Sequence, residues 1–205
     1  DPFGGADFSD FFEQFFGRGA GGAGGAGGGR PGGFSNRGNQ KGGDYETEME
    51  ITLEEAYSGT TRIIQLENEK LRVTTKPGSY DGQSLRIKGK GGPGGQRGDL
   101  FVRIKVQPHP RFIRQDDDLR AKQTIDLYTA VLGGEALVHT LNGQLKVKIT
   151  AGTQPDTTVR LRAKGMPVYG KTGVFGDLYV QWQVLLPENL NEQQKRLFEQ
   201  LQTIR

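Results

Sequence analysis

Apolar and polar residues alternate in several short runs between residues 44 and 187, and this pattern predicts a chain built mainly of β-strands. Side chains of a strand point alternately to its two faces, so an apolar residue at every second position marks a strand with one buried face. The apolar positions are Met49 and Ile51; Leu71 and Val73; Leu85 and Ile87; Leu100, Val102, Ile104 and Val106; and Leu178, Val180, Trp182 and Val184.

These runs belong to a tandem repeat. Residues 51–59 (ITLEEAYSG) match residues 125–133 (IDLYTAVLG) at one constant offset. The Gly-Asp-Leu phrase that begins at Gly98 matches the one that begins at Gly176, and here the offset is slightly longer. The second copy therefore has four extra residues in its Gly/Pro loop, where insertions are tolerated. Such self-similarity predicts two copies of one structural unit.

Two kinds of helix are expected beside the strands. In the first copy, Thr52 and Glu55 have the spacing of a capping box, and Gly59 follows as a stop signal, so we expect a single helical turn there. Near the C-terminus, Asn191 and Gln194 can cap a longer helix over residues 192–203.

The C-terminal helix has one apolar face that needs a partner, because a helix this short is marginal alone. The sequence leaves two alternatives open: the face packs on its own domain, or it packs on a partner subunit. The residues of this face are Leu197, Phe198, Leu201 and Ile204.

The first 43 residues differ from the rest in composition. They hold 16 of the 33 glycines, and residues 1–34 hold 7 of the 11 phenylalanines. Phenylalanines between Phe8 and Phe16 follow helical spacing, whereas residues 17–33 offer too little apolar surface to offset the entropy of ordering glycine. We expect a short Phe-bearing helix on a disordered tether, which either docks onto another surface or is a linker with incidental aromatics.

The predicted organisation is a flexible leader over residues 1–43, two related β-sandwich-like domains over residues 44–113 and 114–187, and a C-terminal helical segment over residues 188–205. The fold class is mainly β. Because the chain starts at Asp1 rather than Met, we expect a fragment of a longer protein.

Charge and composition exclude several functions. The net charge is +3, all of it on residues 44–205, which is a weak field for that much surface. The chain has no cysteine, which excludes disulfides and thiolate-bound metals, and no apolar run approaches the roughly 18 residues of a membrane span. The two histidines, His109 and His139, show no metal or catalytic-triad spacing. We therefore expect no enzyme activity, no cofactor and no metal site.

Basic residues alternate along three of the predicted strands, at residues 85–90, 145–148 and 159–164. A nucleic-acid-binding β protein is therefore the alternative function. The simpler explanation is that these residues form the wet faces of half-buried sheets, since no recognised motif or stacking platform accompanies them.

Several phrases together resemble the DnaJ co-chaperone family, and the resemblance covers the whole chain. They include residues 51–60 (ITLEEAYSGT), 85–91 (LRIKGKG), 98–102 (GDLFV), 109–112 (HPRF) and 176–180 (GDLYV), beside the Gly/Phe-rich leader. Without cysteine the chain looks like the zinc-free class, and the J domain with its His-Pro-Asp motif is missing.

The resemblance implies a cytoplasmic, stress-related homodimer that holds unfolded polypeptide, prevents its aggregation and delivers it to a DnaK-type chaperone. It implies dimerisation through the C-terminal face named above, and contacts of Arg62 and Lys70 with the acidic tail of the DnaK partner. It also implies a shallow apolar client groove, although strand-period residues are core by default. The groove maps onto Met49, Ile51, Ile64, Leu66 and Val102.

Overall fold

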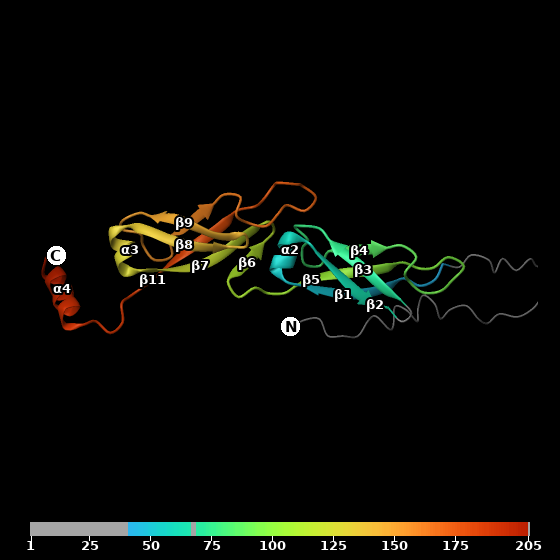
Figure 1. Cartoon of the computed structure of the whole chain (residues 1–205), viewed down its shortest axis with the longest axis horizontal. Helices are drawn as coiled ribbons and strands as arrows, with labels where there is room; N and C mark the ends of the chain where they lie inside the picture. The colour runs from blue at the N-terminus through green and yellow to red at the C-terminus, as the bar shows by residue number, and fades with distance from the viewer. Residues whose placement is uncertain (1–40, 67–68, 205) are drawn as a thin grey trace, which may run out of the picture. The chain divides into compact units, whose positions relative to one another are not determined.

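The computed structural model describes residues 41–66 and 69–204 (Figure 1). The Phe-bearing helix and the glycine tether expected in residues 1–40 lie outside the described residues. The described residues belong to one compact body. Within it the strands form two sets of sheets that share no strand, so the mainly β fold expected from the alternation is confirmed.

The first β unit consists of a three-stranded sheet and a separate hairpin. In the sheet the order is β1-β5-β4, with β1 parallel to β5 and β4 antiparallel to it; β2 and β3 form the antiparallel hairpin. The elements are β1 (Tyr45–Ile51), α2 (Leu53–Ser58), β2 (Thr60–Gln65), β3 (Lys70–Thr75), β4 (Ser84–Ile87) and β5 (Leu100–Val106).

The second β unit repeats this arrangement and adds one strand. Its sheet has the order β10-β11-β7-β6, and β8 and β9 form the hairpin. The added strand, β6, pairs antiparallel with the outer edge of β7. The elements are β6 (Phe112–Gln115), β7 (Asp118–Asp126), α3 (Leu127–Leu132), β8 (Gly134–Thr140), β9 (Gly143–Ile149), β10 (Thr158–Leu161) and β11 (Leu178–Leu185).

The tandem repeat predicted from the sequence is confirmed in the element boundaries. Helix α3 and strand β10 follow α2 and β4 at the same offset that relates Ile51 to Ile125, and β11 follows β5 at the longer offset that relates Gly98 to Gly176. The extra residues of the second copy lie in the loop between β10 and β11. This loop reaches the first unit, where the ring of Phe175 lies 6.0 Å from Tyr57 and the ring of Tyr169 lies 6.1 Å from Tyr80.

Each short helix begins at a side-chain cap. The Thr52 hydroxyl accepts a hydrogen bond from the N–H of Glu55 at 3.2 Å, and the Glu55 carboxylate accepts one from the N–H of Thr52 at 2.9 Å, which confirms the capping box. In the second copy the Asp126 carboxylate accepts from the N–H of Thr129 at 2.8 Å. A six-residue helix is unstable alone, so these caps and the burial of one alanine in each helix fix its position.

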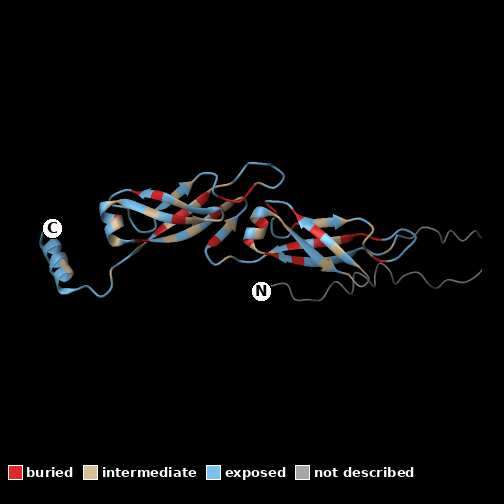
Figure 2. Cartoon of the chain, in the orientation of Figure 1, coloured by how far each residue is buried: buried red, intermediate tan, exposed pale blue. Residues whose placement is uncertain are grey.

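Alternation along the strands separates core from surface, as Figure 2 shows. On β5 the side chains of Val102 and Ile104 are fully buried, whereas Arg103 and Lys105 between and beyond them are exposed. On β11 the largest buried side chain, Trp182, is 1% exposed. Burial of these alternate residues is the main contribution that holds each sheet against its hairpin.

A buried carboxylate ties the start of β5 to two loops. Asp99 accepts hydrogen bonds from the N–H of Gly89 at 2.9 Å and from Nε of Arg86 at 2.9 Å, and its side chain is 6% exposed. Its own N–H donates to the Asp44 carboxylate at 2.7 Å. The hydrogen bond from Gly89 and the ion pair with Arg86 lower the pKa of Asp99 to about 2.

The second unit contains the same arrangement at the repeated positions. Asp177 accepts from the N–H of Ala163 at 2.8 Å and from Nε of Arg160 at 2.6 Å, and its N–H donates to the Asp118 carboxylate at 2.7 Å. The bond from Ala163, followed by the pairing with Arg160, lowers the pKa of Asp177. The Gly-Asp-Leu phrase of each copy therefore has a structural role that the repeat preserves.

Arg114 on β6 links the second unit to a turn of the first. Its Nη1 donates to the carbonyl oxygen of Ser79 at 2.6 Å, Nη2 to that of Gly78 at 3.2 Å, and Nε to that of Asp116 at 2.7 Å. Gly78 has a φ of 84°, and a Cβ there would lie 2.4 Å from the carbonyl oxygen of Pro167. Only glycine fits this contact between the units.

The C-terminal helix α4 (Glu192–Thr203) is confirmed at the predicted boundaries. Asn191 accepts a hydrogen bond from the N–H of Gln194 at 2.8 Å, and the Gln194 side chain accepts one from the N–H of Asn191 at 3.0 Å. The capping box predicted there is therefore present. The division into domains at residues 113 and 187 stays a prediction.

The buried carboxylate of the first unit predicts a specific acid sensitivity. Because the pKa of Asp99 is lowered to about 2, its contribution to stability is full above the unfolded pKa and is lost as the pH falls through the folded pKa. We expect Asp99→Asn to unfold at lower denaturant concentration at neutral pH, and to lose less further stability than the parent between about pH 4 and pH 2.

Denaturant midpoints followed by circular dichroism across this pH range measure the effect. Glu46→Gln, on the exposed face of β1, is the matched control. An Asp99→Asn variant whose midpoint falls with pH as steeply as that of the parent would contradict the assignment.

Candidate functional site

The five residues predicted to line a client groove all lie in or against the core of the first unit. Met49, Ile51 and Val102 are 5%, 1% and 0% exposed, so they are core residues with almost no free surface. Ile64 and Leu66 are half-buried and pack against that core. Of the five, these two are the ones that an incoming chain can contact directly.

Two of the strands that carry these residues, β1 and β2, have an open edge, whereas β5, which carries Val102, is paired on both sides. In the described part of the chain, β1 pairs only with β5, and β2 pairs only with β3. In the second unit the equivalent of β1 is β7, and its outer edge is covered by β6. An open strand edge presents unpaired N–H and C=O groups to any extended polypeptide. We call the free edges of β1 and β2 the open edges of the first unit.

The side chains of β2 divide between its two faces. Ile64 pairs in register with Leu71 of β3 and faces inward, whereas its neighbour Ile63 pairs with Arg72 and is 68% exposed. Leu66 follows the strand, and its N–H donates to the carbonyl oxygen of Glu69 at 2.8 Å. Two half-buried apolar side chains therefore lie next to an edge that can accept a strand.

The two predicted contacts with an acidic tail lie on the same hairpin. Nη2 of Arg62 is 2.7 Å from the Glu55 carboxylate, and both side chains are partly exposed. The bond from the Thr52 N–H and the pairing with Arg62 lower the pKa of Glu55, so it remains charged. Lys70, at the start of β3, is exposed and pairs in register with Gln65. Arg62 is thus already engaged within the chain.

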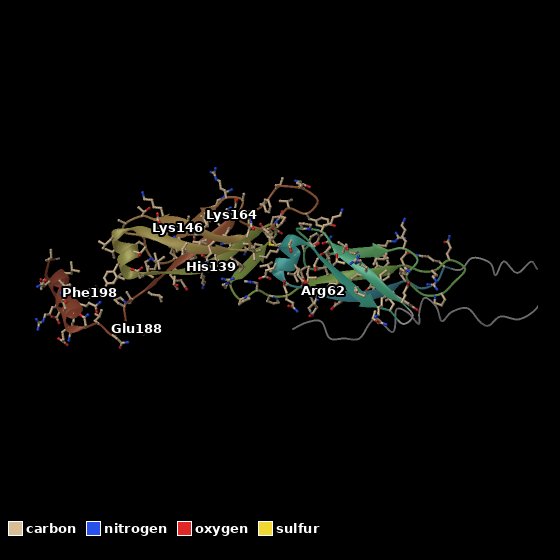
Figure 3. The ribbon with its side chains drawn as sticks, in the orientation of Figure 1. Arg62, His139, Lys146, Lys164, Glu188 and Phe198 are labelled. Carbon is tan, nitrogen blue, oxygen red and sulfur yellow. The ribbon has the colours of Figure 1, made fainter. Side chains whose placement is uncertain are left out.

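The C-terminal apolar face is largely uncovered. No described residue of α4 is buried, and Leu197, Leu201 and Ile204 are 53%, 64% and 78% exposed. Phe198 is half-buried; Figure 3 labels it on α4. A cavity of about 400 Å³ lies between α4 and α3 and is lined almost entirely by apolar side chains.

Sequence reasoning missed the contribution of α3 to this surface. Val131 and Leu132 are 54% and 75% exposed on α3 and line the same cavity. A comparison of the two copies could have indicated this surface, because the equivalent positions of the first copy are Tyr57 and Ser58. The second copy therefore has an exposed leucine at the position where the first copy has a serine.

The two histidines have separate local roles. Nδ1 of His109 accepts hydrogen bonds from the N–H groups of Arg111 and Phe112, both at 3.1 Å, and its Nε2 lies 2.9 Å from Glu54. His139 is on β8 of the second unit (Figure 3). Across residues 41–66 and 69–204, no three His, Cys, Asp or Glu side chains come together as a metal site. The described helices are also too short or too polar to span a membrane.

Comparisons with known proteins agree on one family. The family model described as "DnaJ C terminal domain" matches residues 45–187. "Chaperone protein DnaJ 2" of Thermus thermophilus is 35% identical over 195 residues, which cover 95% of this chain and 65% of that protein. "Chaperone protein DnaJ" of Deinococcus proteolyticus is 36% identical over 218 residues, which cover 97% and 69%.

A further relative has a different name. "Curved DNA-binding protein" of Coxiella burnetii is 30% identical over 211 residues, which cover 95% of this chain and 64% of that protein. The chain thus spans less than two thirds of the Thermus and Coxiella proteins, and 34% of a Natronomonas pharaonis DnaJ that is 46% identical over 132 residues.

Proposed function

The chain belongs to the DnaJ family, and from this premise we propose that it binds unfolded or non-native polypeptide, prevents its aggregation and delivers it to a DnaK-type chaperone. The observation that carries the proposal is the pair of open edges in the first unit, next to the half-buried Ile64 and Leu66. The second unit lacks the equivalent opening at β7, because β6 covers it.

Client binding by added strand fits a chaperone that must accept many sequences. An extended client segment pairs its backbone with an open edge, and backbone pairing depends little on which side chains the client carries. Ile64 and Leu66 then contact alternate client side chains, while Met49, Ile51 and Val102 support them from the core. The apolar contacts favour segments that are buried in folded proteins and exposed in unfolded ones.

Arg62 and Lys70 are proposed to bind the acidic tail of the DnaK partner. Arg62 would exchange its ion pair with the Glu55 carboxylate for one with a carboxylate of the tail. The net gain in binding free energy is small, because exposed ion pairs contribute about 0 to 1 kcal/mol. Lys70 provides a second charge on the neighbouring strand. A weak contact of this kind suits a handover, in which the partner must also leave.

Homodimerisation through the C-terminus is proposed from the uncovered surface formed by α3 and α4. A twelve-residue helix without a buried residue is marginal in water, so its apolar face requires a cover. A second copy of the chain supplies a matching apolar face by symmetry. Two client-binding units joined at their C-termini could hold one unfolded chain at two points, which raises the effective affinity.

A second candidate function is nucleic-acid binding, favoured by the Coxiella relative named for DNA binding and by the exposed basic strands of this chain. A titration of labelled nucleic acid at two salt concentrations distinguishes it from client binding, since phosphate contacts weaken steeply as salt rises.

The client site predicts a contrast between neighbouring residues. Ile64→Ser or Leu66→Ser should weaken binding about tenfold, because loss of one buried aliphatic contact costs about 1.5 kcal/mol or more. Light scattering of a chemically unfolded reporter protein, diluted without nucleotide, measures how far aggregation is suppressed.

Ile63→Ser is the matched control, because Ile63 lies on the opposite face of the same strand. Thermal unfolding checks that each variant is folded. Full suppression of aggregation by well-folded Ile64→Ser and Leu66→Ser variants would remove the groove assignment.

The dimer proposal predicts a change of mass. A chain truncated after Glu188, and the full chain with Leu201→Asp, should both be monomers by multi-angle light scattering, because each loses the apolar cover. Thr203→Asp places the same charge on the same helix but away from its apolar side, and this variant should remain dimeric. A dimer that persists after the truncation would refute the role of α4.

A further inference from the structure

The outward faces of the two main sheets carry opposite charges at equivalent positions. On β1 the outward residues include Glu46 and Glu48, and their equivalents in the repeat are Arg120 and Lys122 on β7. All four side chains are exposed. The same backbone position therefore presents an acid in the first unit and a base in the second.

The acids of the first unit are balanced by their neighbours. Across the β1–β5 register, Glu48 lies beside Arg103 and Glu50 beside Lys105, and the Glu50 and Lys105 side chains are 3.2 Å apart. This face is an ordinary solvated surface with alternating charges. It gives a neutral reference for the second unit, which has the same strand arrangement.

The bases of the second unit have neutral neighbours instead. Across the β7–β11 register, Arg120 lies beside Tyr179 and Lys122 beside Gln181. The Arg120 guanidinium is 5.5 Å from the centre of the Tyr179 ring, and its Nε donates to the Gln115 side chain at 2.6 Å. None of the ion pairs found among the described residues involves Arg120, Lys122 or Arg111.

These residues surround a shallow hollow on the outward face. Its volume is about 370 Å³, and Arg111 and the exposed Ile113 contribute to its wall from the β6 side. Asp156 lies nearby and accepts a hydrogen bond from the Gln181 side chain at 3.1 Å. Asp177 forms an ion pair with Arg160. Besides His109, which is paired with Glu54, the lining residues include three bases, the half-buried ring of Tyr179 and no carboxylate. We call this surface the basic face of the second unit.

We propose that the basic face binds single-stranded nucleic acid, with Arg120, Lys122 and Arg111 contacting phosphates and Tyr179 providing a stacking surface for a base. Arg120 and Lys122 are two residues apart on one strand, so their Cα atoms are separated by about 6.8 Å along it. An acidic peptide would use only the cations. The tyrosine ring provides a flat surface on which an unpaired base stacks.

This inference rests on the nucleic-acid-binding function proposed above and adds the site and the strandedness of the ligand. The first unit supplies the variant that tests it. Arg120→Glu together with Lys122→Glu places in β7 the residues that β1 already carries at the same positions, so the sheet tolerates them.

The experiment measures fluorescence anisotropy of a labelled oligothymidylate of about 20 nucleotides with the full chain, at about 50 and 200 mM salt. The double variant should bind at least tenfold more weakly. The slope of log affinity against log salt concentration should become shallower by about 1.4, the change expected when two phosphate contacts to a single strand are lost. Tyr179→Ala should weaken binding to the single strand, and Tyr179→Phe, which places the Phe101 equivalent there, should not.

The comparison variant is Lys146→Glu together with Lys148→Glu on β9, one of the basic strands that raised nucleic-acid binding from the sequence. It changes the net charge by the same amount at the same spacing, so it distinguishes that strand from the basic face as the site. Figure 3 labels Lys146 on the hairpin, where its Nζ lies 3.7 Å from Glu135. This pair of substitutions should reduce affinity far less than the pair on the basic face.

Three outcomes overturn the inference in different ways. If the parent binds the oligonucleotide and both double variants bind equally well or equally poorly, the basic face is not the site, although nucleic-acid binding stands. If the parent prefers a duplex of the same length, the strandedness is wrong. If the parent binds no nucleic acid but binds polyglutamate, the second candidate function itself falls and the face recognises acidic polypeptide.

Discussion

Backbone hydrogen bonding at the sheet edges is the constraint on which the rest of this structure depends. An edge strand leaves N–H and C=O groups without a partner, and a protein either covers such an edge or uses it. In the second unit β6 covers β7, and in doing so it brings Arg114 to the carbonyl groups of Gly78 and Ser79 in the first unit. In the first unit β1 and β2 remain open among the described residues. The edge of β7 is thereby covered and joined to the first unit, while the equivalent edge of β1 can accept a strand.

Duplication explains how one small scaffold can carry different surfaces. The buried carboxylate of Asp99 and the half-buried carboxylate of Asp177 accept hydrogen bonds from equivalent backbone positions, so this part of the framework is kept in both copies. Exposed positions differ between the copies: Leu132 beside α4 stands where the first copy has Ser58, and Arg120 on the basic face stands where the first copy has Glu46. Substitutions at exposed sites cost little stability, which allows new surfaces to arise without loss of the fold.

Local signals in the sequence were enough to predict the repeat, its loop insertion, the capping box at Thr52 and the helix over residues 192–203, because each depends on near neighbours. Strand β6 was not predicted, since so short a strand carries too little alternation and its partner edge is set by tertiary structure. Periodicity also could not separate groove from core: Met49, Ile51 and Val102 are buried, and only the fold shows that Ile64 and Leu66 have free surface. The basic face was obscured because a small net charge averages it with the acids of the first unit.

Amide hydrogen exchange with a bound unfolded peptide tests most directly whether clients occupy the open edges of the first unit. The account predicts that peptide slows exchange at amides in residues 45–51 or 60–65, since an added strand supplies new hydrogen-bond partners there. The covered strand β7, residues 118–126, should exchange at the same rate with and without peptide. Slowed exchange in the second unit alone, or unchanged exchange in both units at saturating peptide, would contradict it.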